Sequence, residues 1–225
     1  MRSLFILSLP RSLSSQTYEW VRRSTRLKTP RWCTDGEFLN VDRYVHLAEG
    51  SDDSGLKLMR PDVHAIKFRE MYTFAEEIVR EEGYVYKDVV QPYLMRSFLQ
   101  KNDFPVLKIK RSLADVAWSM QRKNWYYPSQ LSENTSGLEA LIRGLATMRD
   151  CLQSIPGETI TFEEILRDER RLYHKLSQLY PYENLKWVRY MDAEFKAQRK
   201  VILERRAQTS YGEIMGMIRD LGLQP

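Results

Sequence analysis

The chain has 225 residues, of which 43% are hydrophobic and 12% aromatic, so it can bury one sizeable core. We expect a single domain over residues 1–225. The formal net charge of +5 suits an anionic ligand, but the 35 Lys and Arg residues alternate with 30 Asp and Glu residues, which argues against nucleic acid as a partner. Two distant cysteines and three scattered histidines form no ligand pattern, so we expect no metal site.

The chain begins with an apolar run over residues 4–9 that is typical of a buried parallel strand. Pro10 ends the run, and a short basic turn rich in hydroxyl groups follows. Residues 14–17 supply N-cap residues for a helix through Tyr18 and Val21. Because the first N–H groups of a helix have no intrahelical partners and the helix dipole is positive there, this turn predicts an anion site.

A secretory signal peptide is the alternative interpretation of this apolar run. The run is shorter than a normal signal-peptide core, Arg11 interrupts it, and no small-residue cleavage site follows. No other segment approaches the roughly 20 apolar residues of a membrane span. We therefore expect a cytoplasmic protein without a membrane partner.

The turn lacks the Gly-Lys-Ser/Thr ending of a Walker A motif. It resembles instead the loop with which sulfotransferases hold the 5′-phosphosulfate of 3′-phosphoadenosine 5′-phosphosulfate (PAPS). The resemblance implies that the cofactor-binding loop consists of Pro10, Arg11, Ser12, Leu13, Ser14, Ser15 and Gln16. Two positions depart from the family: its glycine is Leu13 and its adenine-contacting tryptophan is Gln16. A side chain at position 13 fits only if the backbone needs neither a positive φ nor close ligand approach.

A second strand-to-helix junction follows the apolar segment 105–110. It also resembles the sulfotransferases, in which an arginine at the strand end and a serine eight residues later bind the 3′-phosphate of the cofactor. Arg111 and Ser119 stand at that spacing, although Leu113 replaces the family's proline. The chemistry suits the task, because a guanidinium fork matches phosphate oxygens and a helix hydroxyl can donate to a third oxygen.

A short strand predicted over residues 84–87 ends in Lys87, where the resemblance places a catalytic lysine. Such a lysine neutralises the charge that develops on the bridging oxygen as the sulfur–oxygen bond breaks. The histidine that many relatives use as general base is replaced by Val89. Asp88 is the nearest carboxylate and our candidate base; a simple ion pair or a helix cap is its structural alternative. His64 and Glu70 are competitors for the base role.

The later part of the chain carries a further resemblance. The segment 158–162 is similar to the family's strand before its adenine-contacting tyrosine, which is Phe162 here, and a helix is predicted over residues 171–179. Plain core packing is the alternative role of Phe162. We expect most of the late basic residues at 199–206 to form a solvated face of a charged helix, with a contact to the 3′-phosphate as the alternative. The segments 31–52 and 125–137 are candidate linings of an acceptor site.

Strands near residues 4–9, 84–87, 105–110 and 158–162 alternate with helical patterns. This order predicts a three-layer α/β/α fold of the P-loop type with a central parallel sheet, and ligands at the carboxyl ends of its strands. The resemblance implies a sulfotransferase that moves a sulfuryl group from PAPS to the hydroxyl or amine of an unidentified acceptor and releases 3′-phosphoadenosine 5′-phosphate (PAP). Arg11, Lys87 and Asp88 are then the catalytic residues. A small-molecule or nucleotide kinase and a non-catalytic nucleotide-binding protein stay open as alternatives.

Overall fold

The computed structural model describes residues 1–30, 36–38, 60–63, 65–79, 82–126, 137–189, 200–201, 204 and 206–225. Its centre is a four-stranded sheet in which every neighbouring pair is parallel and the order is β2-β1-β3-β4. The strands are β1 (Leu4–Ser8), β2 (Val85–Asp88), β3 (Val106–Lys110) and β4 (Glu158–Thr161). Each bound lies within one residue of the sequence-based prediction.

Strand β1 lies inside the sheet and is buried on both faces, which explains why its sequence is an unbroken apolar run. Leu4 and Ile6 are completely buried in one hydrophobic core, whereas Phe5 and Leu7 point into the other. The two cores are therefore separated by the sheet itself, and β1 connects them.

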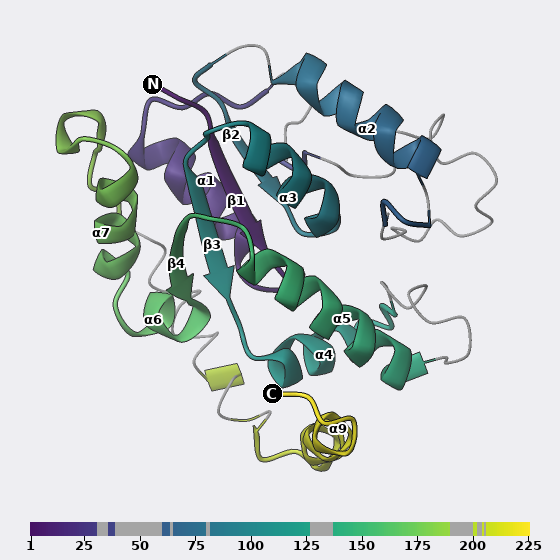
Figure 1. Ribbon diagram of the computed structural model, residues 1–225. Helices are drawn as coiled ribbons and strands as arrows, with labels where there is room; N and C mark the ends of the chain where they lie inside the picture. Colours follow the sequence, from purple (N-terminus) through teal and green to yellow (C-terminus); the bar gives the residue numbers. More distant parts are fainter. Residues whose placement is uncertain are drawn as a thin grey trace.

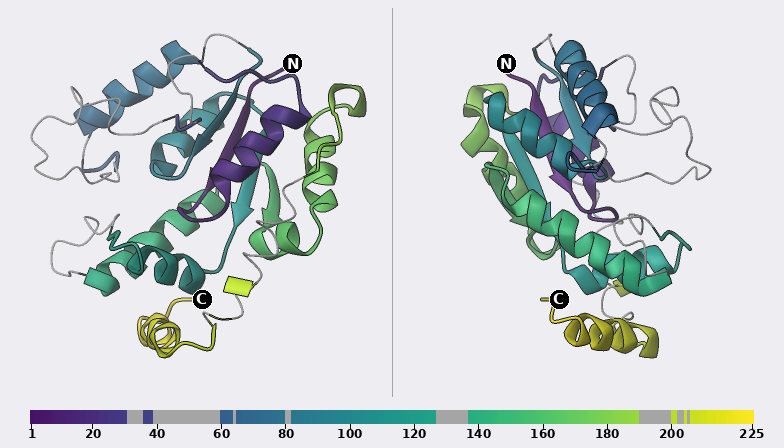
Figure 2. Two further views of the ribbon diagram at one scale, coloured as in Figure 1. Left: turned by 180° about the vertical axis from the view of Figure 1, so that it is seen from behind. Right: turned by 45° about the vertical axis from the view of Figure 1, so that its right-hand side comes forward.

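Helices cover both faces of the sheet (Figure 1). One face carries α1 (Ser14–Ser24), α6 (Phe162–Arg167) and α7 (Arg170–Leu179). The core on the other face is built with α2 (Ala65–Ile78), α3 (Pro92–Lys101), α4 (Leu113–Gln121), α5 (Gly137–Gln153) and α9 (Thr209–Asp220). A 3₁₀ turn, η4, spans Tyr182–Asn184. The left view of Figure 2, which shows the molecule from behind, has α1 in front of the strands. The predicted three-layer α/β/α fold is confirmed.

Two helices start differently from the prediction. Phe162, expected at the end of a strand, is the first residue of α6, because Thr161 and Glu164 form a reciprocal capping box there. Helix α7 begins one residue before the predicted Arg171. A charged helix was also predicted at 199–206. Of its basic residues the structure describes Lys200 and Arg206, and Lys200 Nζ lies 3.7 Å from Glu204 Oε1. Arg199 and Arg205 lie outside the described residues.

All four strands point toward the end of the sheet at which α4 and α9 lie (Figure 1). In a parallel sheet the carboxyl ends of the strands meet along one edge, and ligands of open α/β folds bind there. The described helices include none long and apolar enough to cross a membrane. Within the same residues, no three His, Cys, Asp or Glu side chains come together as a metal site would require.

Candidate functional site

The loop between β1 and α1 has two residues in the left-handed backbone region. Arg11 has φ 60°, and Leu13, the N-cap of α1, has φ 66° and ψ 17°. For a residue with a Cβ this conformation costs about 1–2 kcal/mol. From the sequence, we expected a side chain to fit at position 13 only if the backbone there did not need a positive φ. The structure shows a positive φ at Leu13, so this expectation is wrong. The leucine side chain is 9% exposed and packs in the core beside α1, which offsets the strain of its backbone.

The expectation that residues 14–17 cap α1 is also corrected. The helix starts at Ser14, and its N-cap Leu13 offers no side-chain acceptor. The first intrahelical bond runs from the Thr17 N–H to the Leu13 carbonyl, so the amides of residues 14–16 have no partner from the preceding turn. These amides and the neighbouring hydroxyl groups leave the helix N-terminus able to accept an anion.

Arg11 is the exposed cation of this loop. Its Nε donates to Ser119 Oγ at 3.2 Å, and its guanidinium lies 5.6 Å from the ring centroid of Trp125. Ser119 belongs to α4, which follows β3. The resemblance assigned Arg11 to the 5′-phosphosulfate and Ser119 to the 3′-phosphate of the same nucleotide. In the structure these two residues are neighbours, although they are 108 positions apart in the chain.

Lys87 lies near the end of β2 and is 2% exposed. Its Nζ donates to Ser15 Oγ at 3.0 Å and to Glu37 Oε1 at 2.7 Å. The first contact joins the predicted catalytic lysine to the predicted phosphosulfate loop. The second contact pairs its charge with a carboxylate that sequence reasoning did not single out.

Glu37 reaches Lys87 because the short segment 36–38 lies beside β2. The amide of Lys87 donates to the Gly36 carbonyl at 2.7 Å, and the Phe38 amide donates to the Lys87 carbonyl at 2.8 Å. Gly36 has φ +79°, and a Cβ there would meet the ring of Tyr18 at 2.3 Å, so only glycine fits. Residue 37 falls within the segment 31–52 that we expected near an acceptor, but no motif distinguished it from the other charges there.

Asp88 occupies the other side of the β2 end and is 4% exposed. Its Oδ1 accepts from the amides of Val90 at 3.0 Å and Gln91 at 2.7 Å, immediately before α3. Burial raises the pKa of Asp88 to about 7, although these two backbone hydrogen bonds lower it. The carboxylate thus closes the turn that precedes α3. It is not the helix cap that the sequence analysis offered as an alternative, because the N-cap of α3 is Gln91 and no side chain makes a capping hydrogen bond there.

Arg111 follows β3 and is 6% exposed. One guanidinium nitrogen donates to the Arg11 carbonyl, which ties the β3 end to the loop between β1 and α1. The guanidinium carbon lies 4.0 Å from the ring centroid of Phe162. Phe162 itself is completely buried in the core beside α1, α6 and α7, so the face predicted for adenine carries the Arg111 cation in this structure.

The remaining predicted residues divide into two groups. Ser12 is buried in the loop, with its Oγ 3.4 Å from the Pro10 carbonyl. Ser14 is buried as the first residue of α1, and Gln16 is partly exposed in the first turn of that helix. By contrast, Glu70 is exposed on α2, which packs on α3. His64 lies outside the described residues, as do residues 31–35, 39–52 and 127–136 of the two candidate acceptor segments.

The C-terminal helix α9 adds contacts that the sequence did not predict. It packs against α4, and Arg206 before it lies 4.0 Å from Asp115, a fully buried residue in the first turn of α4. Burial raises the pKa of the Tyr211 hydroxyl, and the negative charge of Asp115 raises it further. Helix α9 is therefore anchored at the turn that follows Arg111.

No known family profile and no curated protein sequence matches the chain. Among solved structures, it is similar to a sulfotransferase from Mycobacterium avium at 12% identity and a TM-score of 0.51, over 98% of this chain and 76% of that one. A sulfotransferase from Alicyclobacillus acidocaldarius gives 12% identity and a TM-score of 0.47, over 98% and 95%. A sulfotransferase domain from the olefin synthase of Synechococcus PCC 7002 gives 16% identity and a TM-score of 0.46, over 78% and 71%. The likeness to the first structure shows a sulfotransferase-like P-loop fold.

Proposed function

We propose that the protein is a PAPS-dependent sulfotransferase built as one domain over residues 1–225. The observation that carries the proposal is the convergence of Arg11, Lys87 and Arg111 on one loop. These three cations come from the ends of three parallel strands. They are joined through Ser15, Ser119 and the backbone of Arg11. Three cations around a helix N-terminus match an ester with two separate phosphate groups.

The residues present fit the nucleotide on chemical grounds. The amides of residues 14–16 and the Ser15 hydroxyl would hold the 5′-phosphosulfate, with Arg11 beside them. Arg111 and Ser119 would hold the 3′-phosphate. When bound, PAPS supplies the sulfuryl group that passes to the acceptor oxygen or nitrogen. No metal is assigned a role in this proposal.

The same residues divide the work of transfer. Lys87, almost fully buried and aimed at Ser15, would stabilise the negative charge on the departing phosphate oxygen. Glu37, 2.7 Å from Lys87, would take the proton from the acceptor hydroxyl or amine. We transfer the base role from Asp88 to Glu37 because Asp88 Oδ1 already accepts two backbone N–H groups, whereas the Glu37 side chain is 21% exposed and open to an acceptor.

Calorimetry on the full chain tests this function against the kinase alternative. The proposal predicts binding of PAP without Mg²⁺ and a clear preference for PAP over ATP. A preference for ATP that depends on Mg²⁺ would contradict it and favour a kinase. Binding of PAP without any conversion of PAPS, in the presence of mixed phenols, alcohols and amines, would favour a non-catalytic nucleotide-binding protein.

A further inference from the structure

Trp125 is an exposed aromatic residue whose backbone is fixed at the end of α4. The residue is 44% exposed, and Asn124 before it has a left-handed backbone with φ 55°. The Trp125 amide donates to the Met120 carbonyl at 3.0 Å, and the Asn124 amide donates to the Gln121 carbonyl at 2.9 Å. These two hydrogen bonds form a Schellman motif, which ends a helix in a defined geometry. The backbone of Trp125 therefore has a set position relative to α4.

The side chain of Arg11 has two partners on this part of the chain. Its guanidinium lies 5.6 Å from the centroid of the Trp125 ring, and its Nε donates to Ser119 Oγ at 3.2 Å. A tryptophan ring attracts a guanidinium cation more strongly than the other aromatic rings do. Ser119 lies in α4 and Trp125 follows its end, so one helix restricts the Arg11 side chain from two positions.

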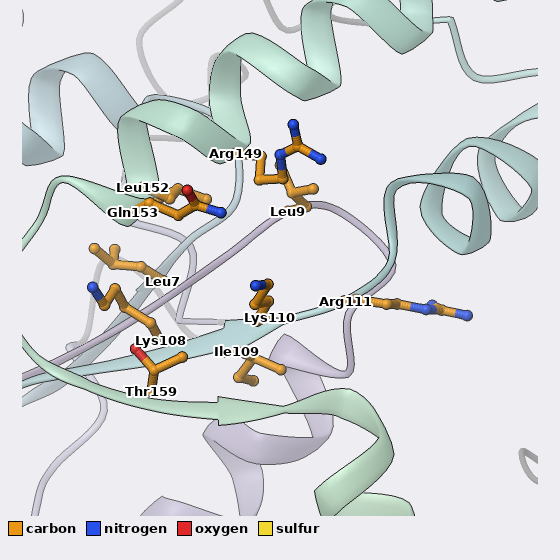
Figure 3. Close-up of a pocket in the computed structure, with 10 residues that line it drawn as sticks. All are labelled: Leu7, Leu9, Lys108, Ile109, Lys110, Arg111, Arg149, Leu152, Gln153 and Thr159. Atoms are coloured by element: carbon orange, nitrogen blue, oxygen red, sulfur yellow. The ribbon is translucent and has the colours of Figure 1, made fainter. Parts of the chain in front are cut away.

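The backbone of Arg11 is held from the same region, by a residue between β3 and α4. Arg111 donates to the Arg11 carbonyl. Figure 3 shows the Arg111 side chain directed away from Lys110 and Arg149, so it does not serve the side of the sheet that α5 covers. The hydrogen bond supports the left-handed conformation of Arg11, φ 60°, which is unfavourable for a residue with a Cβ. The segment from the end of β3 to Trp125 therefore holds both the backbone and the side chain of Arg11.

The partners of the Arg11 side chain are uncharged, which matters for anion binding. Among the described residues, no carboxylate pairs with Arg11, whereas Lys87 is paired with Glu37 at 2.7 Å. The two terminal nitrogens of the Arg11 guanidinium donate to no described residue, so their N–H groups remain for a ligand. A hydroxyl and an indole can order the side chain without cancelling its charge. An arginine that is ordered in advance loses less rotamer freedom when the ligand binds.

We propose that Trp125 is a positioning residue for Arg11. The indole keeps the guanidinium beside the loop between β1 and α1, where the 5′-phosphosulfate of PAPS would bind, and does not itself contact the reacting atoms. This inference deepens the proposed function and rests on it. From the sequence, we expected Trp125 to line an acceptor site as the first residue of the segment 125–137; its contact with Arg11 adds a role at the nucleotide.

Calorimetry tests the proposal by measuring PAP binding to the parent chain, Trp125→Leu, Arg11→Gln and the variant with both changes. We expect Trp125→Leu to lower the affinity for PAP about two- to fivefold, the range of an exposed cation–π contact. In the Arg11→Gln background the same change should have no further effect, because the cation that the ring holds is absent. Trp125→Phe, which keeps an aromatic face, should restore most of the affinity. Far-ultraviolet circular dichroism checks that each variant folds.

Trp187→Leu is the matched control, since Trp187 is also 44% exposed and packs against Tyr173 of α7 with a centroid distance of 5.4 Å. It should leave the affinity for PAP unchanged. An unchanged affinity in Trp125→Leu, an equal loss in the Arg11→Gln background, or a failure of Trp125→Phe to restore binding would overturn the positioning role. A parent chain that does not bind PAP would overturn the sulfotransferase proposal and this inference with it, so the two failures are distinguishable.

Discussion

The backbone conformation of Leu13 predicts which of two variants, Leu13→Ala or Leu13→Gly, has the higher free energy of unfolding. The residue has φ 66° and ψ 17° and a side chain that is 9% exposed. Leu13→Ala and Leu13→Gly both remove most of the buried side chain, which typically lowers the free energy of unfolding by about 2–5 kcal/mol. The two variants differ in how their backbones tolerate the left-handed region.

At an ordinary position alanine is more stable than glycine by about 0.4–1 kcal/mol, because glycine loses more backbone freedom on folding. In the left-handed region alanine keeps a penalty of about 1–2 kcal/mol that glycine avoids. The difference between the midpoints of these two ranges predicts that Leu13→Gly is more stable than Leu13→Ala by about 0.8 kcal/mol. At about 2–4 °C per kcal/mol for a chain of this size, glycine should melt roughly 1–4 °C higher.

Urea and thermal unfolding of both variants measure this difference. Leu145, completely buried within α5, provides the control pair, since in a helix interior Leu145→Ala should be more stable than Leu145→Gly by about 1 kcal/mol. The opposite order at the two positions is the expected result. If alanine is the more stable substitution at position 13 as well, the loop does not have the left-handed backbone that we describe, and the reasoning fails.

Three further predictions concern the end of β2. Asp88→Asn keeps an oxygen that can accept from the Val90 and Gln91 amides and should fold with little loss, whereas Asp88→Ala should lose about 1 kcal/mol in urea unfolding; equal stability would refute the role of Asp88 in this turn. Burial raises the pKa of Asp88 from 3.8 to about 7, so between these two pH values the folded state holds a proton that the unfolded state has lost. The contribution of Asp88 to the free energy of unfolding should therefore fall as the pH rises from about 4 to about 7 and level off above pH 7. Asp88→Asn should remove that part of the pH dependence, and a profile identical to that of the parent chain would contradict the shift. Glu37→Gln should slow the release of PAP from PAPS with mixed acceptors by about 10²–10⁴-fold while PAP affinity is kept, with the exposed Glu183→Gln as control; full activity in Glu37→Gln would exclude it as the base.

The strands could be predicted from sequence because buried parallel strands are short apolar runs with sharp ends. The strand Val106–Lys110 could be predicted even though Lys108 and Lys110 interrupt its apolar run. Arg111 could be placed beside the loop because the carboxyl ends of parallel strands share one edge. Its contact with the Arg11 backbone follows from the β1–β3 register.

Other parts of the site could not be predicted, for physical reasons. A left-handed N-cap is normally signalled by glycine or asparagine, so Leu13 gave no sign of it. Glu37 lies in a segment without periodicity, and its position depends on the pairing of Gly36 and Phe38 with Lys87. A catalytic base and a residue that closes the turn after a strand call for the same residue type at the same strand end, and only the contacts of Asp88 Oδ1 distinguish the two roles.

Discrimination of the 3′-phosphate tests the central claim most directly. Calorimetry compares PAP with 5′-AMP, which lacks that group, on the parent chain and on Arg111→Ala. We predict that the parent chain binds PAP about 10–100-fold more tightly than AMP, because Arg111 contributes charge-assisted hydrogen bonds of about 1.5–3 kcal/mol. Arg111→Ala should bind both nucleotides alike while its far-ultraviolet circular dichroism stays unchanged. Equal affinities on the parent chain, or discrimination that survives in the variant, would contradict the sulfotransferase account.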